Sequence, residues 1–181
     1  MKFLYWNIRG IANKSSRDTL FSFSTKQISP DVICLAEPMI EPDKFPLSFL
    51  RSINMHLLSF NSRDGCSKIW VLCSNNITDP IVFSNSDQEI TLDFGSTTKT
   101  FRVTFIYASV LIATRRRLWN SMRCLSLNSC PWILIGDFNA ILGSHERMGG
   151  NLPNPTSCQD IANMIAENDL QEIEAKGAFF T

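Results

Sequence analysis

Trp132-Ile133-Leu134-Ile135-Gly136-Asp137-Phe138-Asn139 is the stretch of sequence that decides the fold. Its first four residues form an apolar run that is typical of a buried strand. An acid and an amide, Asp137 and Asn139, follow directly at the strand exit. Because ligands of α/β proteins bind beyond the carboxyl ends of strands, this stretch predicts a strand that delivers polar groups to a site for metal and phosphate chemistry.

Two further strand exits carry the same kinds of side chain. Trp6-Asn7-Ile8-Arg9-Gly10 follows an opening strand and offers an amide, Asn7. Leu35-Ala36-Glu37-Pro38 follows the apolar Val32-Ile33-Cys34 and offers a carboxylate, Glu37. Three strand ends therefore supply oxygen ligands or amides.

The pattern of apolar residues predicts eight strands and three helices. The strands are expected at residues 3–7, 32–36, 55–60, 68–73, 80–83, 89–94, 100–107 and 132–136. The helices are expected at residues 15–28, 114–125 and 157–168. Ser15 or Ser16 is the expected cap of the first helix, and Thr156 or Ser157 that of the third.

The turn signals between residues 55 and 107 predict antiparallel pairing there. Strands this numerous, with helices near both ends of the chain, predict two packed sheets with helices outside, a layered α/β sandwich. With 181 residues and 44% hydrophobic content, the chain is expected to form one domain over residues 1–181.

Composition narrows the classes of function. Seventeen basic residues balance seventeen acidic ones, so any binding of a polyanion depends on local patches. The six cysteines form no CxxC pair, which argues against a zinc site or a disulfide framework and favours a reducing compartment. Neither a signal peptide nor a bilayer-spanning apolar run is found, so the sequence predicts an intracellular protein, nuclear or cytoplasmic, without membrane contact.

The polar groups at the strand exits fit hydrolysis of a phosphodiester. Mg²⁺ prefers oxygen ligands and keeps several waters, so one or two carboxylates with a substrate phosphate suffice to hold it, and Glu37 is the candidate ligand. Asp137 would orient or deprotonate a water, and Asn7 and Asn139 would donate to the phosphate. Tyr107, at the end of a strand, would add a phenolic hydrogen bond.

Four motifs in this order resemble the endonuclease/exonuclease/phosphatase superfamily. They are Trp-Asn-x-Arg-Gly at residues 6–10, Leu-Ala-Glu-Pro at 35–38, Tyr-Ala-Ser at 107–109 and Gly-Asp-Phe-Asn at 136–139. The residues in these motifs are most similar to those in the endonuclease domain of plant LINE-type (non-LTR) retrotransposons. In these elements a reverse transcriptase accompanies the endonuclease. The resemblance implies a four-layered α/β sandwich, Mg²⁺ or alternatively Mn²⁺ as cofactor, and the phosphate backbone of DNA as partner.

The resemblance also assigns roles to single residues. Asn7 and Glu37 match the metal-side pair, with Glu37 the direct ligand. Tyr107 matches a phosphate-contacting tyrosine, and Asp137 and Asn139 match the water-activating acid and its neighbouring amide. Residues 177–181 look like the start of a later strand of the family, in which Thr181 would lie near the DNA backbone.

Two departures from the family pattern are expected to matter. The family places a further acid and a Ser-Asp-His motif later in the chain, whereas the histidines here are His56 and His145. The chain is therefore expected to be a fragment that lacks the last strands of the sandwich and has little or no activity alone. Val110 also stands where related endonucleases commonly have an asparagine.

Three functional hypotheses remain open from the sequence. The first is a Mg²⁺-dependent DNA endonuclease, the second an inactive remnant that only binds metal or nucleic acid, and the third a relative that hydrolyses inositol phosphates or lipid headgroups. Arg115, in the triplet at residues 115–117, is a candidate phosphate contact or equally a solvated helix start. No protein partner is predicted.

Overall fold

The computed structural model describes residues 1–96, 99–126, 130–146, 148–149 and 152–173. These residues form two compact units, one of residues 1–107 with 130–137 and one of residues 108–129 with 138–181. The single domain over residues 1–181 stays a prediction.

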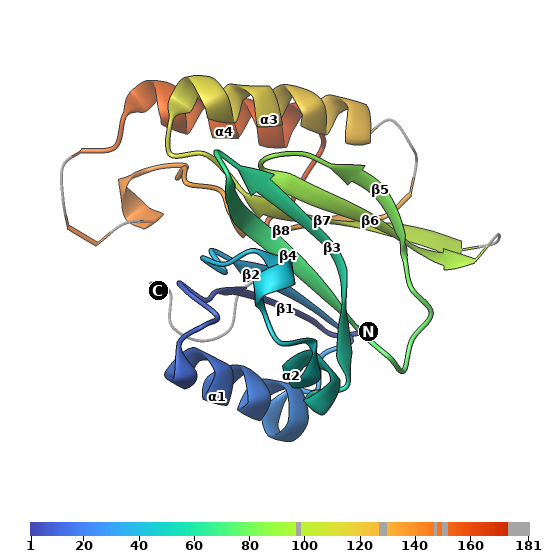
Figure 1. The fold of residues 1–181 in the computed structure, drawn as a ribbon. Coiled ribbons are helices and arrows are strands. Elements are labelled where there is room, and N and C mark those ends of the chain that lie inside the picture. The colour runs from blue at the N-terminus through green and yellow to red at the C-terminus, as the bar shows by residue number, and fades with distance from the viewer. Residues whose placement is uncertain (97–98, 127–129, 147, 150–151, 174–181) are drawn as a thin grey trace. The chain divides into compact units, whose positions relative to one another are not determined.

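The first unit contains two four-stranded sheets (Figure 1). The first sheet has the order β1-β2-β4-β3, from β1 (Phe3–Asn7), β2 (Val32–Ala36), β4 (Cys66–Ser74) and β3 (Met55–Arg63). The second has the order β5-β6-β7-β8, from β5 (Ile81–Asn85), β6 (Glu89–Ser96), β7 (Lys99–Tyr107) and β8 (Trp132–Asp137). All eight predicted strands are present, and the predicted mixed α/β fold with two sheets is confirmed.

The pairing of the strands refines the expected antiparallel run between residues 55 and 107. That run divides between the two sheets, because β3 and β4 pair in the first and β5, β6 and β7 in the second. At one edge of each sheet two strands run parallel, β1 with β2 and β7 with β8. Each parallel pair brings two carboxyl ends side by side.

Apolar side chains fill the space between the sheets. Alternate residues of β2 and β4 contact alternate residues of β6 and β7 there, in a cluster formed by Val32, Cys34, Ile69, Val71, Cys73, Ile90, Leu92, Phe94, Val103 and Phe105. Every member of this cluster is at most 3% exposed. At roughly 25 cal/mol per Å² of buried apolar surface, this layer is a main source of stability.

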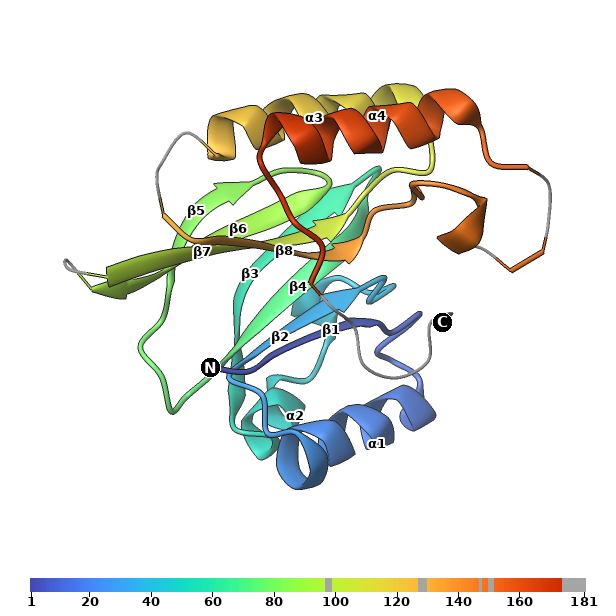
Figure 2. The same ribbon diagram turned by 180° about the vertical axis from the view of Figure 1, so that it is seen from behind.

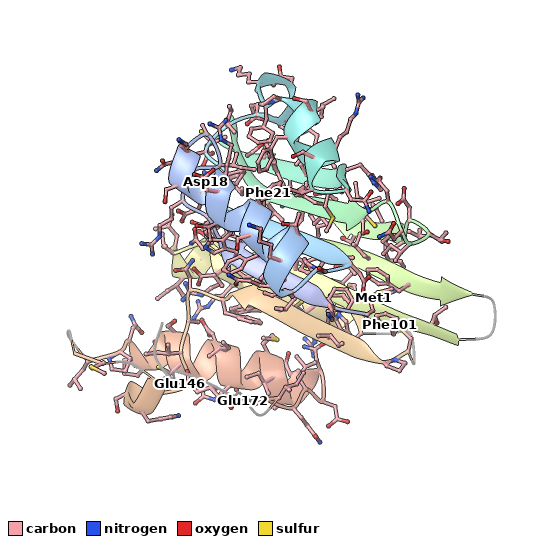
Figure 3. The ribbon with its side chains drawn as sticks, turned by 90° about the horizontal axis from the view of Figure 1, so that it is seen from below. Met1, Asp18, Phe21, Phe101, Glu146 and Glu172 are labelled. Carbon is pink, nitrogen blue, oxygen red and sulfur yellow. The ribbon has the colours of Figure 1, made fainter. Side chains whose placement is uncertain are left out.

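The outer face of the first sheet is covered by helices. Leu20 of α1 (Lys14–Ser22) and Leu50 of α2 (Leu47–Ser52) pack against Ile33, Leu35 and Trp70. Figure 2 shows both helices on this face, and Figure 3 shows α1 with Asp18 and Phe21 along it. The chain continues from α1 into a π-helical turn, η1 (Phe23–Gln27), and a 3₁₀ turn, η2 (Pro42–Lys44), precedes α2.

The second unit pairs two helices, α3 (Ile112–Leu125) and α4 (Pro155–Glu167), with a short 3₁₀ turn, η3 (Ser144–Glu146), between them in sequence. An ion pair joins them, since Arg116 Nε lies 2.8 Å from Asp160 Oδ2. Among the described residues, no helix is long and apolar enough to span a membrane.

The predicted helix caps were wrong. α1 begins at Lys14 after Asn13, so Ser15 and Ser16 lie inside the helix. In α4 the cap is Asn154, whose Oδ1 accepts hydrogen bonds from the backbone N–H of Thr156 and Ser157. Pro155 explains the shift, because proline has no N–H and its fixed φ suits the first helical position. The sequence analysis also missed α2, whose six residues are too few to show a helical period.

Gly136 provides a test of how closely β7 and β8 approach. Its φ is +155°, and a Cβ at this position would collide with the carbonyl oxygen of Ile106. We therefore expect Gly136→Ala to lower the free energy of unfolding by about 3 kcal/mol or more in urea titration. Gly65→Ala is the control: its φ is +71° with open space around it, so the cost should be only about 1 kcal/mol. Equal losses in the two variants would contradict the close approach.

Candidate active site

Four of the predicted site residues converge at one end of the first unit. Asn7 ends β1 and Glu37 directly follows β2, while Tyr107 ends β7 and Asp137 ends β8. The parallel registers pair Asn7 with Ala36 and Tyr107 with Asp137. Because β1 and β8, the edge strands of the two sheets, also lie against each other, all four residues are at neighbouring strand ends.

A hydrogen bond joins the two sheets at this end. The Tyr107 hydroxyl donates to Glu37 Oε1, although the two residues are 70 positions apart. Burial, the bond to Glu37 and the nearby Asp137 carboxylate all raise the pKa of Tyr107 well above its usual value. The phenol therefore stays protonated near neutral pH and remains a hydrogen-bond donor beside two carboxylates.

The backbone of Glu37 has an unusual conformation. Its φ is +52°, in the left-handed region that costs a non-glycine residue of order 1 kcal/mol or more. Two backbone hydrogen bonds hold it there: Glu37 N–H donates to the Lys68 carbonyl at 3.0 Å, and Gly10 N–H donates to the Glu37 carbonyl at 2.9 Å. Residues held in such conformations by their surroundings concentrate at functional sites, which supports a functional role for Glu37.

The amide oxygen of Asn7 is placed to bind a cation or to accept a hydrogen bond. Its Oδ1 is buried and has no hydrogen-bond partner among the described residues, although buried amide oxygens are nearly always bonded. Together with the Glu37 carboxylate it forms a set of hard oxygen donors, the kind that Mg²⁺ and related divalent cations prefer. Asn7 and Glu37 therefore fit a divalent cation of the kind that hydrolysis of a phosphodiester requires.

Arg63 is a candidate residue that the sequence analysis missed. It is the last residue of β3, and its positive charge acts on the Tyr107 hydroxyl, opposing the upward pKa shift that burial and Glu37 cause. Its Nη1 is buried without a hydrogen-bond partner among the described residues. The sequence offered only a turn signal at residues 61–65, because nothing in it showed that β3 continues to Arg63.

Asn139 lies in the second unit, because the division between the units falls between Asp137 and Phe138. Its Nδ2 donates to the Ala108 carbonyl at 2.8 Å, and its φ is +46°. The neighbouring Phe138 ring stacks on Trp119 with the ring centroids 6.2 Å apart. These contacts fix the loop after β8, and a role for the Asn139 amide on a phosphate stays a prediction.

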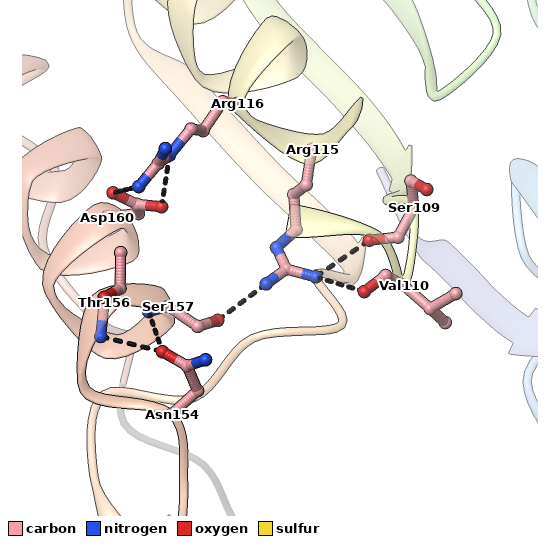
Figure 4. Close-up of polar contacts among 8 residues, drawn as sticks. All are labelled: Ser109, Val110, Arg115, Arg116, Asn154, Thr156, Ser157 and Asp160. Carbon is pink, nitrogen blue, oxygen red and sulfur yellow. Dashed lines mark hydrogen bonds and ion pairs between the residues drawn. The ribbon is translucent and has the colours of Figure 1, made fainter. Parts of the chain in front are cut away.

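Arg115 is built into the second unit (Figure 4). The residue is 3% exposed, and its guanidinium donates to the carbonyl oxygens of Ser109 and Val110 and, at 2.6 Å, to Ser157 Oγ. Burial lowers the pKa of Arg115, the carboxylate of Asp160 opposing that effect. Contact with a substrate phosphate stays a prediction for Arg115, and it would have to displace or share these hydrogen bonds.

The remaining sequence predictions bear less on the site. Thr181 and the rest of residues 174–181 lie outside the described residues. Val110 is 72% exposed, so the position expected to hold an asparagine is apolar and open to solvent. His145 lies in η3, with its Nε2 3.9 Å from Glu146 Oε1.

The sequence profile of the endonuclease/exonuclease/phosphatase family matches residues 4–157. The chain belongs to this family. The match spans Asn7, Glu37, Tyr107 and Asp137, so the four converging residues all lie within the family domain. A search of curated proteins found no significant match in sequence.

Solved nuclease structures share the fold of this family member. An AP endonuclease from Archaeoglobus fulgidus matches with a TM-score of 0.68 and 15% identity, over 92% of this chain and 70% of that one. A 3'-5' exonuclease (NExo) from Neisseria meningitidis matches with a TM-score of 0.66 and 15% identity, over 92% and 71%. The endonuclease domain of TRAS1, a telomere-specific non-LTR retrotransposon, matches with a TM-score of 0.65 and 10% identity, over 92% and 71%. At these identities the likeness concerns the fold.

The role of Arg115 can be tested through stability. Removing its side chain leaves the Ser109 and Val110 carbonyls without their donor, so we expect Arg115→Ala to lower the free energy of unfolding by about 2 kcal/mol. Asn120→Ala, on an exposed position of the same helix, should change it by no more than about 0.5 kcal/mol. Urea denaturation followed by circular dichroism measures both. If Arg115→Ala were as stable as Asn120→Ala, the buried contacts would not be structural.

Proposed function

We propose that this domain is a Mg²⁺-dependent phosphodiester hydrolase that acts on the DNA backbone. The observation that carries the proposal is the meeting of Glu37, Tyr107 and Asp137 at the ends of strands from both sheets, near Asn7 Oδ1, which has no hydrogen-bond partner in the described part of the chain. Membership of a family of divalent-metal-dependent nucleases and phosphatases supports it. The nuclease neighbours support a nucleic-acid substrate over an inositol phosphate or a lipid headgroup.

Each residue has a defined part in this proposal. Glu37, with Asn7 beside it, would hold the cation, which supplies a Lewis acid that polarises the phosphate. Asp137 orients or deprotonates the attacking water, and the water oxygen forms a bond to phosphorus as the bond to the leaving oxygen breaks. The protonated Tyr107 hydroxyl and the Arg63 guanidinium donate to the phosphate oxygens, whose negative charge grows in the transition state.

We also propose that the domain comes from a retrotransposon and that its activity requires residues outside these 181. The origin rests on the four motifs in their order, and TRAS1 adds that such a retrotransposon endonuclease has this fold. The Ser-Asp-His motif of the family has no counterpart in the 181 residues, so the acid and histidine would come from a segment outside them. The chain by itself would then bind metal and have little or no hydrolytic activity.

Metal binding by the chain is the first test. We expect Glu37→Gln to weaken Mn²⁺ affinity at least tenfold, because the amide removes the negative charge from the direct ligand while keeping its shape. Asp43→Asn, at an exposed acid in the 3₁₀ turn η2, is the matched control and should leave the affinity unchanged. Electron paramagnetic resonance of free Mn²⁺ reports binding without activity. Equal affinity in wild type and Glu37→Gln would remove Glu37 from the metal site.

Cleavage is tested with a longer form that carries the expected acid and Ser-Asp-His segment, taken from its own reading frame or grafted from a relative. This form should nick supercoiled DNA with Mg²⁺, and Asp137→Asn should slow it about 100-fold or more, since general-base catalysis contributes about that factor. Gel assays of nicked plasmid measure both rates. A soluble inositol phosphate is the comparison substrate, and faster hydrolysis of it would overturn the DNA assignment.

The 181-residue chain serves as the second arm of that assay. We expect it to nick DNA barely or not at all under the conditions in which the longer form is active. Strong nicking by the short chain would overturn the dependence on further residues and leave the rest of the proposal standing. Metal binding without cleavage by either form would favour an inactive remnant.

A further inference from the structure

A second cluster of metal-ligand side chains lies at the opposite end of the first sheet. A ring nitrogen of His56, Cys73 Sγ and an Asp79 carboxylate oxygen all lie within 4.8 Å of one another. His56 and Cys73 are register partners on β3 and β4, and Asp79 lies in the connection that leads from β4 to the second sheet. Along β4, roughly 17 Å of extended strand separates Cys73 from Lys68, whose carbonyl holds Glu37.

The hydrogen bonds around His56 set its tautomer. Asn75 Nδ2 donates to Asn54 Oδ1 at 3.3 Å, which orients the Asn75 amide so that its Oδ1 faces His56. That oxygen lies 2.8 Å from His56 Nδ1, and because an amide oxygen only accepts, Nδ1 must carry a proton. In the neutral ring Nε2 then carries a lone pair. A second-shell hydrogen bond of this kind is what orients metal-binding histidines in proteins.

A ring nitrogen of His56 lies close to a carboxylate. Nε2 lies 3.0 Å from Asp79 Oδ1, yet it is buried and has no hydrogen-bond partner among the described residues. Two acceptors this close repel unless a proton or a cation lies between them. An imidazolium ion pair would satisfy the first case, and a bound metal ion the second.

The third side chain favours the metal ion. The Cys73 thiol is buried and lies close to both His56 and Asp79. An imidazolium pair would use His56 and Asp79 alone, whereas a cation would also take Cys73 as a thiolate ligand, releasing the thiol proton to solvent. The side chains of His56 and Asp79 are 36% and 53% exposed, which leaves a path for an ion from solvent.

We propose that His56, Cys73 and Asp79 form a Zn²⁺ site, distinct from the oxygen site at the other end of the sandwich. The donor set of one imidazole nitrogen, one thiolate and one carboxylate suits zinc and not magnesium. Three protein ligands leave a fourth, tetrahedral position for water. The ion would tie the start of β3 and the end of β4 to the connection between the sheets, and so stabilise the sandwich.

The sequence analysis did not find this site, because its residues are far apart along the chain. The analysis of the cysteines considered CxxC pairs, but His56 and Cys73 are brought together by the antiparallel register of β3 and β4. Asn75 acts through His56 and is therefore a positioning residue. The site does not depend on the proposed nuclease function.

The experiment uses the full 181-residue chain with excess Mg²⁺ present, so that oxygen sites are occupied. Titration with Co²⁺ should give one equivalent of binding with a thiolate-to-cobalt charge-transfer absorption, and Zn²⁺ should displace it. Cys73→Ser should abolish that absorption, while Cys66→Ser, at the exposed other end of β4, and Glu37→Gln should keep it. Absence of the absorption, or its persistence in Cys73→Ser, would overturn the proposal.

Variants of the more exposed residues test the site if Cys73→Ser does not fold. His56→Gln and Asp79→Asn should each weaken Co²⁺ binding at least tenfold, and Asn75→Ala should weaken it about tenfold while His56 is still present. Zn²⁺ should raise the thermal unfolding midpoint of the wild type and not that of His56→Gln, because only the native state assembles the three ligands. Equal shifts in the two proteins would show that the ion binds elsewhere, and the cluster would then be an ion pair.

Discussion

The apolar layer between the two sheets is the constraint on which the rest of the structure depends. Val32 and Cys34 from the first sheet and Val103 and Phe105 from the second are completely buried in it. Packed sheets keep a fixed separation of about 10 Å and a fixed mean strand direction. The ends of β2 and β7 are therefore held near each other, and a tyrosine hydroxyl from one sheet reaches a carboxylate beyond the other. The geometry of the candidate site at this end follows from the packing of apolar side chains.

The two ends of the same sandwich carry different ligand chemistry. At one end the side chains are oxygen donors, Glu37, Asp137 and the amide of Asn7, which suit a hard cation and a phosphate. At the other end an imidazole and a thiol meet a carboxylate, which suits a softer ion. β4 runs between them, with Lys68 near the first and Cys73 near the second. A single strand thus links a proposed reactive end to a proposed structural one.

The arginines of α3 show how tertiary contacts divide residues that look alike in sequence. Arg115 is buried and donates hydrogen bonds to two carbonyls and a serine hydroxyl, whereas Arg116 pairs with Asp160 at the surface. The position of each on the helix decides this, because neighbouring residues on a helix point about 100° apart. A basic triplet therefore does not by itself define a phosphate-binding patch. Arg63, isolated in sequence, is the arginine whose charge acts on the Tyr107 hydroxyl of the candidate site.

The sequence by itself determined the eight strands, three of the helices and the polar residues at the strand exits. Apolar runs and turn residues are local signals, and the motifs at residues 6–10, 35–38 and 136–139 mark strand ends whatever the strands pair with. It did not determine α2 or the Asn154 cap, because a short helix has no readable period and Pro155 shifted the first helical position.

Only the tertiary structure decided which residues meet. The Tyr107–Glu37 bond, the place of Arg63 and the pairing of His56 with Cys73 all depend on sheet order and register, and these are set by packing between segments far apart in the chain. Tertiary packing also decided that Arg115 is buried inside the second unit. Long-range contacts of this kind leave no local trace in a single sequence, which is why strand ends were predictable and their partners were not.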